Sequence, residues 1–137
     1  LTLPGRMPNI SSRAQTGSGA NVHVGGFSVT GPKPRQLLVR GVGPGLANFG
    51  VAGVLTDPTL EIFNASGEMI LANDNWGSTT NSAEVRTAAT AVGAFALADG
   101  SRDSAVLVTL DPGSYTVQVS GVSGATGISL VEVYEVP

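Results

Sequence analysis

The sequence predicts an all-β fold: a two-sheet antiparallel β-sandwich of jelly-roll type with one short helix. Three observations lead to this prediction. First, 19 glycines and 8 prolines interrupt the 137 residues at short intervals. Second, the runs between them are short and rich in Val, Leu, Ile and Thr, as β-strands are. Third, strand-like runs do not alternate with long helical patterns, as a parallel α/β sheet would require.

Seven segments have the length and composition of strands. The clearest is 114–120, where Tyr115, Val117 and Val119 alternate with polar residues. The expected strands are 21–30, 36–42, 59–64, 68–72, 104–110, 114–120 and 128–136.

Two of these segments carry further information. The segment 104–110 is apolar on both faces, which predicts a central strand. In 21–30 the apolar phase changes at Gly25-Gly26, which predicts a β-bulge. The same phase places His23 on the polar side of the strand, opposite Val22 and Val24.

Residues 84–96 form the one helical candidate, because Val85, Ala88 and Val92 recur at helical spacing. Asn81 and Glu84 have the spacing of a capping box. The stretch 46–54 is expected to be irregular or a short helical turn, with Leu46, Phe49 and Val51 pointing inward.

Residues 1–20 differ from the rest and are treated as an extended N-terminal arm, with the sandwich at 21–137. Leu1, Leu3, Met7 and Ile10 are apolar, but prolines and a glycine interrupt them. The segment could be an edge strand of its own domain or an arm that packs on a neighbouring molecule. Because the chain begins at Leu1, we expect it to have been processed or cut from a longer one.

Composition excludes several classes of function. With no cysteine, the chain has no disulfide framework and no Cys-type zinc site. Its seven basic residues are scattered without a stripe, which argues against nucleic-acid binding. No apolar run approaches the ~18 residues of a membrane span. Charged residues make up only 12%, so the surface must be mostly Ser, Thr, Asn, Gln and Gly, and it allows close packing against other copies.

Several motifs resemble a known family. The segment 57–67 reads DPTLEIFNASG, the segment 73–76 reads NDNW, and the segment 110–117 reads LDPGSYTV. In this order they resemble the bacterial pre-peptidase C-terminal type of β-sandwich domain, over about residues 57–136. The longer string from Ser12-Arg13-Ala14 through LLVRGVGPGLANFGV (37–51) to LVEVYEV (130–136) spans nearly the whole chain. It resembles domains near the ends of large exported proteins of environmental bacteria, Verrucomicrobia among them. These resemblances imply an extracellular, non-catalytic module and identify no ligand.

A calcium site is the first candidate for specific chemistry. Asn73, Asp74 and Asn75 offer hard oxygen ligands at close spacing, and Asp57 could join them if the fold brings it near. Asn and Asp also favour turns, so this loop has a purely structural interpretation as well. Calcium is the one cofactor that the sequence suggests.

Three other features, Trp76, the segment 41–45 and His23, have both a functional and a structural interpretation. Trp76 could stack on a sugar ring, or it could cover the core or form part of a subunit contact. The segment 41–45 (GVGPG) looks like a phosphate loop, but it lacks the Lys and Ser/Thr that such a loop needs, so a turn is expected. His23 is the only histidine, and no Ser-His-Asp pattern accompanies it, so no catalytic residue is predicted.

The sequence therefore favours a non-catalytic extracellular or cell-surface module. Its first hypothesis is a structural protein that forms homo-oligomers or filaments by β-strand addition, with Leu1, Leu3, Met7 and Ile10 as assembly residues. The alternative is an accessory module of a secreted enzyme that binds calcium or a glycan at residues 73–76.

Overall fold

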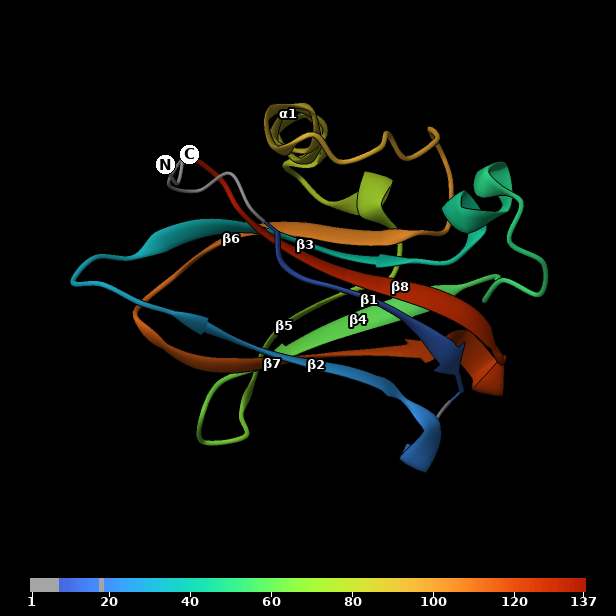
Figure 1. Cartoon of the computed structure of the whole chain (residues 1–137), viewed down its shortest axis with the longest axis horizontal. Coiled ribbons are helices and arrows are strands. Elements are labelled where there is room, and N and C mark those ends of the chain that lie inside the picture. The colour runs from blue at the N-terminus through green and yellow to red at the C-terminus, as the bar shows by residue number, and fades with distance from the viewer. Residues whose placement is uncertain (1–7, 18) are drawn as a thin grey trace.

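A computed structural model describes residues 8–17 and 19–137. In this part of the chain, eight strands form two four-stranded antiparallel sheets that pack face to face (Figure 1), which confirms the predicted β-sandwich. Sheet A has the order β1-β8-β3-β6, and sheet B has the order β2-β7-β4-β5. The strands are β1 (Pro8–Thr16), β2 (His23–Val29), β3 (Arg35–Val42), β4 (Pro58–Phe63), β5 (Met69–Asn73), β6 (Ser104–Leu110), β7 (Gly113–Gly121) and β8 (Gly127–Glu135).

One α-helix and four 3-10 turns connect the strands. The helix is α1 (Ser82–Val92), and the turns are η1 (Gly19–Asn21), η2 (Pro44–Phe49), η3 (Trp76–Ser78) and η4 (Val122–Gly124). The helix ends at Val92 rather than at residue 96, because Gly93 takes a left-handed conformation with φ of 77°. The predicted capping box is wrong, since Asn81 makes no side-chain cap and its amide donates instead to Leu107 O, 3.4 Å away.

Strand β1 occupies much of the segment expected to be an arm. It pairs with β8 from Pro8↔Tyr134 to Thr16↔Gly127, and Ile10 packs against the central core. Residues 8–16 are therefore an edge strand of their own domain, which was one of the two alternatives for this segment, so the predicted boundary at residue 21 is wrong and Ile10 is a packing residue of the sandwich. Leu1, Leu3 and Met7 lie outside the described residues.

The main core lies between the two sheets. Alternate residues of the facing strands are fully buried there, as the alternation along 114–120 predicts for Val117 and Val119. Burying each such side chain contributes about 1.5–3 kcal/mol. The buried residues of this core are Phe27, Val29, Leu37, Val39, Leu55, Leu60, Ile62, Val106, Leu110, Val117, Val119, Val131 and Val133.

A second core covers the outer face of sheet A. There α1, η2 and η3 lie over β3, β6 and β8 (Figure 1), and Leu38, Trp76 and Val85 are buried between the layers. This layer explains why β6 is apolar on both faces. The prediction that 104–110 is a central strand is wrong, since β6 is an edge strand of sheet A.

In strand β2 the residues that point into the sandwich are not the predicted ones. It pairs with β7 without interruption from His23↔Val119 to Val29↔Gly113, so there is no bulge at Gly25-Gly26. His23 points into the sandwich with 6% exposure, whereas Val24 is 53% exposed. A Cβ atom on Gly25 would come within 2.7 Å of Ile10 Cδ1, so a larger residue there would displace the end of the Ile10 side chain.

Candidate functional site

The loop that carries the calcium candidates closes one open side of the sandwich, between the edge strands β5 and β6. Asn73, at the end of β5, is buried, and its side chain is fully engaged. Its Oδ1 accepts the backbone N–H of Ala105 in β6 at 3.1 Å, and its Nδ2 donates to Asn75 O at 3.2 Å. Asn73 therefore joins the edge of sheet B to the edge of sheet A, and its side chain has a structural role.

Of the four predicted ligands, the fold brings two carboxylates together. Asp74 lies close to Asp57, and partial burial, a hydrogen bond with Asp57 and the charge of Asp57 raise the pKa of Asp74, while Arg102 opposes this. Arg102 Nη1 lies 3.9 Å from Asp57 Oδ2, and Asp57 Oδ1 is a buried atom without a hydrogen-bond partner. Asn75 precedes η3 without making a side-chain cap. Within residues 8–17 and 19–137, no three His, Cys, Asp or Glu side chains are grouped as for a metal ion.

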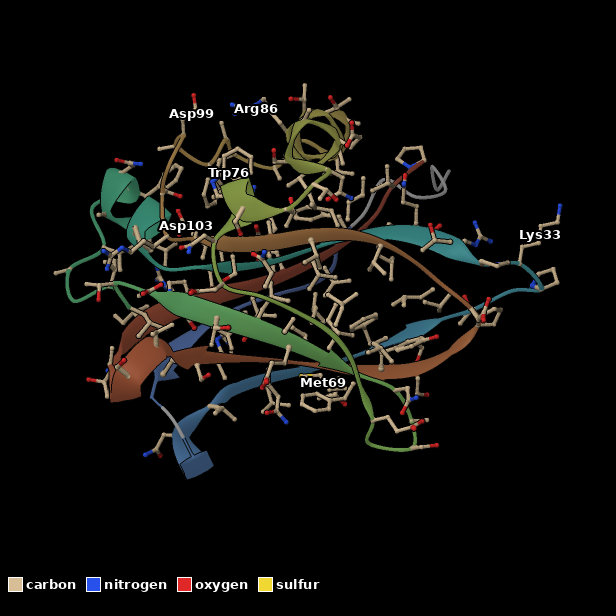
Figure 2. All side chains as sticks on the ribbon, turned by 180° about the vertical axis from the view of Figure 1, so that it is seen from behind. Lys33, Met69, Trp76, Arg86, Asp99 and Asp103 are labelled. Carbon is tan, nitrogen blue, oxygen red and sulfur yellow. The ribbon has the colours of Figure 1, made fainter. Side chains whose placement is uncertain are left out.

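Trp76 is part of the second core. Its side chain is 3% exposed, its Nε1 donates to Ala98 O at 3.1 Å, and the guanidinium of Arg86 lies 5.0 Å from its ring centroid. Figure 2 shows Trp76 under Arg86, which pairs with Asp99 at the surface. The prediction that Trp76 presents a ring face to a sugar is wrong, and its role as a cover of the core is the one observed.

The glycine-rich segment after β3 does bind an anion, but the anion is a side chain of the same protein. Asp103 is fully buried, and its Oδ1 accepts the backbone N–H groups of Gly43 at 2.8 Å and Gly45 at 3.1 Å. Its Oδ2 accepts the hydroxyl of Ser101 at 2.8 Å. No room remains for a phosphate, and the predicted turn is the observed structure. No sequence pattern indicates this role of Asp103, because Gly43 lies 60 positions and Gly45 58 positions earlier in the chain.

His23 is held in a chain of hydroxyl groups between the sheets. Thr16 Oγ1 donates to Ala14 O at 3.1 Å and lies 2.7 Å from Ser129 Oγ, which lies 2.9 Å from His23 Nδ1. Each hydroxyl has one proton, so Ser129 donates to Thr16 and accepts from Nδ1–H. His23 Nε2 is then the acceptor for Ser12 Oγ, 3.1 Å away. In the neutral imidazole this arrangement places the proton on Nδ1, and burial, which lowers the pKa of His23, favours that neutral form.

The sheet edges remain as candidate working surfaces. The edge of β6 is partly satisfied, because the side chains of Asn73 and Asn81 bond to its backbone at Ala105 and Leu107. Strand β5 pairs with β4 alone in the described sheets, and its sequence MILAN contains no charge and no proline. Met69 is 54% exposed and Ile70 is 39% exposed. Such an edge lacks the charged or proline residues that usually block pairing with another strand, and its one irregularity is the register shift against β4 that leaves Ile70 without a partner there.

Comparison with known proteins agrees with this fold. The chain is similar in structure to the pre-peptidase C-terminal domain of collagenase from Bacillus anthracis, with a TM-score of 0.53 and 12% sequence identity. The likeness covers 91% of this chain and 88% of that domain. No protein-family profile matches the chain, and no curated protein matches it.

At this level of identity the likeness shows the fold alone. It agrees with the resemblance seen in the motifs at 57–67, 73–76 and 110–117, which here form the β4–β5 hairpin, the closing loop and the β6–β7 turn. Among the described helices, none has the length and apolar character needed to cross a membrane.

Proposed function

We propose that this chain is a non-catalytic extracellular module that works through its sheet edges, by adding a strand of a neighbouring molecule to β5. The proposal rests on the exposed, uncharged edge of β5. Strand β5 has exposed Met69 and Ile70, no charged residue, and only one neighbour in the described sheets. Backbone groups of alternate residues in an edge strand point away from the sheet and can pair with another strand.

The buried polar groups support the non-catalytic part of the proposal. Asp103, Asn73 and His23 have the residue types of a reactive site, but each is engaged in hydrogen bonds that hold the fold. The fold likeness to a pre-peptidase C-terminal domain supports the extracellular part, since the motif resemblance implies a module of exported proteins.

The test places a positive charge on the edge. Ile70→Lys should weaken self-association, because an added strand would bury the charge of the lysine. Sedimentation velocity over a concentration series measures the association. Val24→Lys is the matched control, since Val24 is similarly exposed on β2, the other edge strand of sheet B. Equal loss in both variants, or loss only with Val24→Lys, would contradict a role for β5.

Calcium binding is the second candidate function, and one feature favours it. The buried Oδ1 of Asp57 has no hydrogen-bond partner and lies in the carboxylate pair with Asp74. If a calcium ion binds this pair, added CaCl2 should raise the melting temperature of the wild-type chain and not that of Asp74→Asn. Asn75→Ala is the control within the same loop. A wild-type melting temperature that does not respond to millimolar CaCl2 would refute this function.

A further inference from the structure

The outer face of sheet A contains an apolar hollow that the second core leaves uncovered. It has a volume of about 370 Å³ and lies between η2 and the edge strand β1. Its apolar walls come from Leu46, Phe49, Val51, Phe95 and Leu130, and Ser11 and Arg13 of β1 complete the lining. Phe49 is 61% exposed, so the prediction that it points inward is wrong. An aromatic ring left in water beside an apolar hollow gains free energy when another apolar group covers it.

Arg13 gives this hollow a charge preference. Arg35, Arg40, Arg86 and Arg102 each lie within 4 Å of a carboxylate. Arg13 has no such partner in the described residues, which include every Asp and Glu of the sequence. The hollow therefore presents an apolar surface next to an unpaired guanidinium, which suits an apolar side chain that neighbours a carboxylate.

The same chain carries the complementary pair on another surface. Glu68 and Met69 stand next to each other where the β4–β5 hairpin enters β5, and both are exposed. Glu68 accepts a hydrogen bond from Asn64 but has no cationic partner in the described residues. Along the long axis in Figure 1, the yellow-green hairpin and the teal turns of η2 lie toward opposite ends, and Figure 2 shows Met69 away from those turns.

From this complementarity we infer that a second copy of the chain docks its Glu68–Met69 pair in the hollow, with Met69 against Phe49 and the Glu68 carboxylate on Arg13. The inference rests on the proposed self-association and names its second contact. Because the hollow and the hairpin are different surfaces, the contact is head-to-tail, and each copy added leaves one hollow and one hairpin free. Repeated, the contact extends into an open chain of copies, or closes into a ring where the rotation between successive copies allows it.

The test reverses the two charges. In sedimentation velocity, Arg13→Glu and Glu68→Arg should each weaken the association of the wild-type chain by about tenfold. The double variant, Arg13→Glu with Glu68→Arg, should recover most of that loss. Lys33→Glu and Glu84→Arg are matched controls, since both positions are exposed and lie outside the hairpin and the hollow, on the β2–β3 turn and on α1. Met69→Ser should weaken association without changing its dependence on salt.

The outcomes separate this inference from the proposal on which it rests. A double variant as weak as the single variants, or controls that lose as much as the single variants, would overturn the docking of Glu68 on Arg13. If Ile70→Lys weakens association while the charge reversals do not, strand addition at β5 stands and the docking is wrong. A wild-type chain that stays monomeric at about 1 mM would overturn both.

Discussion

The guanidinium of Arg40 is bonded to the carboxylate of Glu132 on the outer face of sheet A, out of contact with solvent. Arg40 Nε donates to Glu132 Oε1 at 3.0 Å, and Nη1 donates to Phe95 O at 2.6 Å, with the Phe95 ring centroid 4.4 Å from the guanidinium carbon. Tyr134 donates its hydroxyl to Glu132 Oε2 at 2.6 Å, and burial followed by this hydrogen bond raises the pKa of Tyr134. The network joins β3 and β8 to the segment after α1.

We expect Glu132→Gln to lower the free energy of unfolding by about 3–5 kcal/mol, because it leaves the buried charge of Arg40 without an anion. Urea denaturation measures this loss. The double variant Arg40→Met with Glu132→Leu should be clearly more stable than Glu132→Gln, since it removes both charges. Arg35→Met is the control, because the Arg35–Glu135 pair is partly exposed and its loss should cost no more than about 1 kcal/mol. A similar cost for Glu132→Gln and Arg35→Met would contradict the importance of the buried network.

The Arg40 network also shows where prediction from sequence ends. Periodicity and turn residues suffice to predict the sandwich, because alternation such as that of Val117 and Val119 is a local property of one strand. Arg40 and Glu132 stand in β3 and β8, and the two residues are 92 positions apart in the sequence. Burial of a charge depends on such a partner, and no local pattern reveals it.

The same limit explains the errors at single residues. Val24 is more apolar than His23, so a local pattern places the valine inside, yet Ser12 and Ser129 provide the inward position with partners for an imidazole. Trp76 stands in a polar loop, but α1 and the segment after it cover the indole. Among the calcium candidates, Asp57 and Asp74 stand in two different loops, and only the fold shows that these loops lie together. The structural use of Asn73 depends on β6, which follows it by about thirty positions.

Asn73 and Asn75 differ in role although they stand two positions apart. We expect Asn73→Ala to lower the free energy of unfolding by about 1–3 kcal/mol, because the buried N–H of Ala105 loses its acceptor. Asn75→Ala should change it by no more than about 0.5 kcal/mol, since its side chain makes no cap. Thermal unfolding in EDTA makes the comparison free of any bound cation. Equal effects of the two variants would show that the hydrogen bond from Ala105 N–H to Asn73 does not stabilise the edge of β6.

Asp74 should make stability depend on pH in the direction opposite to most carboxylates. Its folded pKa is raised above the model-peptide value of 3.8, so between the two values the folded state binds more protons than the unfolded one. The free energy of unfolding therefore falls as pH rises through this window. Asp74→Asn should stabilise the chain at pH 7 by about 0.2–1 kcal/mol, since the Asp74 side chain is exposed and solvent weakens its interaction with Asp57. Melting curves should show this gain shrink as pH falls toward 4, whereas a gain that is constant with pH would exclude charge repulsion as its cause.

His23 should make the sandwich less stable in mild acid. Its folded pKa lies below the ordinary value of 6.5, so as pH falls through 6.5 the unfolded chain takes up a proton before the folded one does. The melting temperature should be level above pH 7 and should decline below about pH 6.5 until the folded imidazole is itself protonated. His23→Gln keeps hydrogen-bonding groups between Ser12 and Ser129 but does not titrate, so its curve should remain level down to about pH 5, where carboxylates begin to respond. A decline of the same size in both proteins would assign the acid sensitivity to other groups. The tautomer can be tested by NMR of the imidazole nitrogens, and a proton on Nε2 would contradict the direction of the hydrogen bonds from Thr16 through Ser129 to His23.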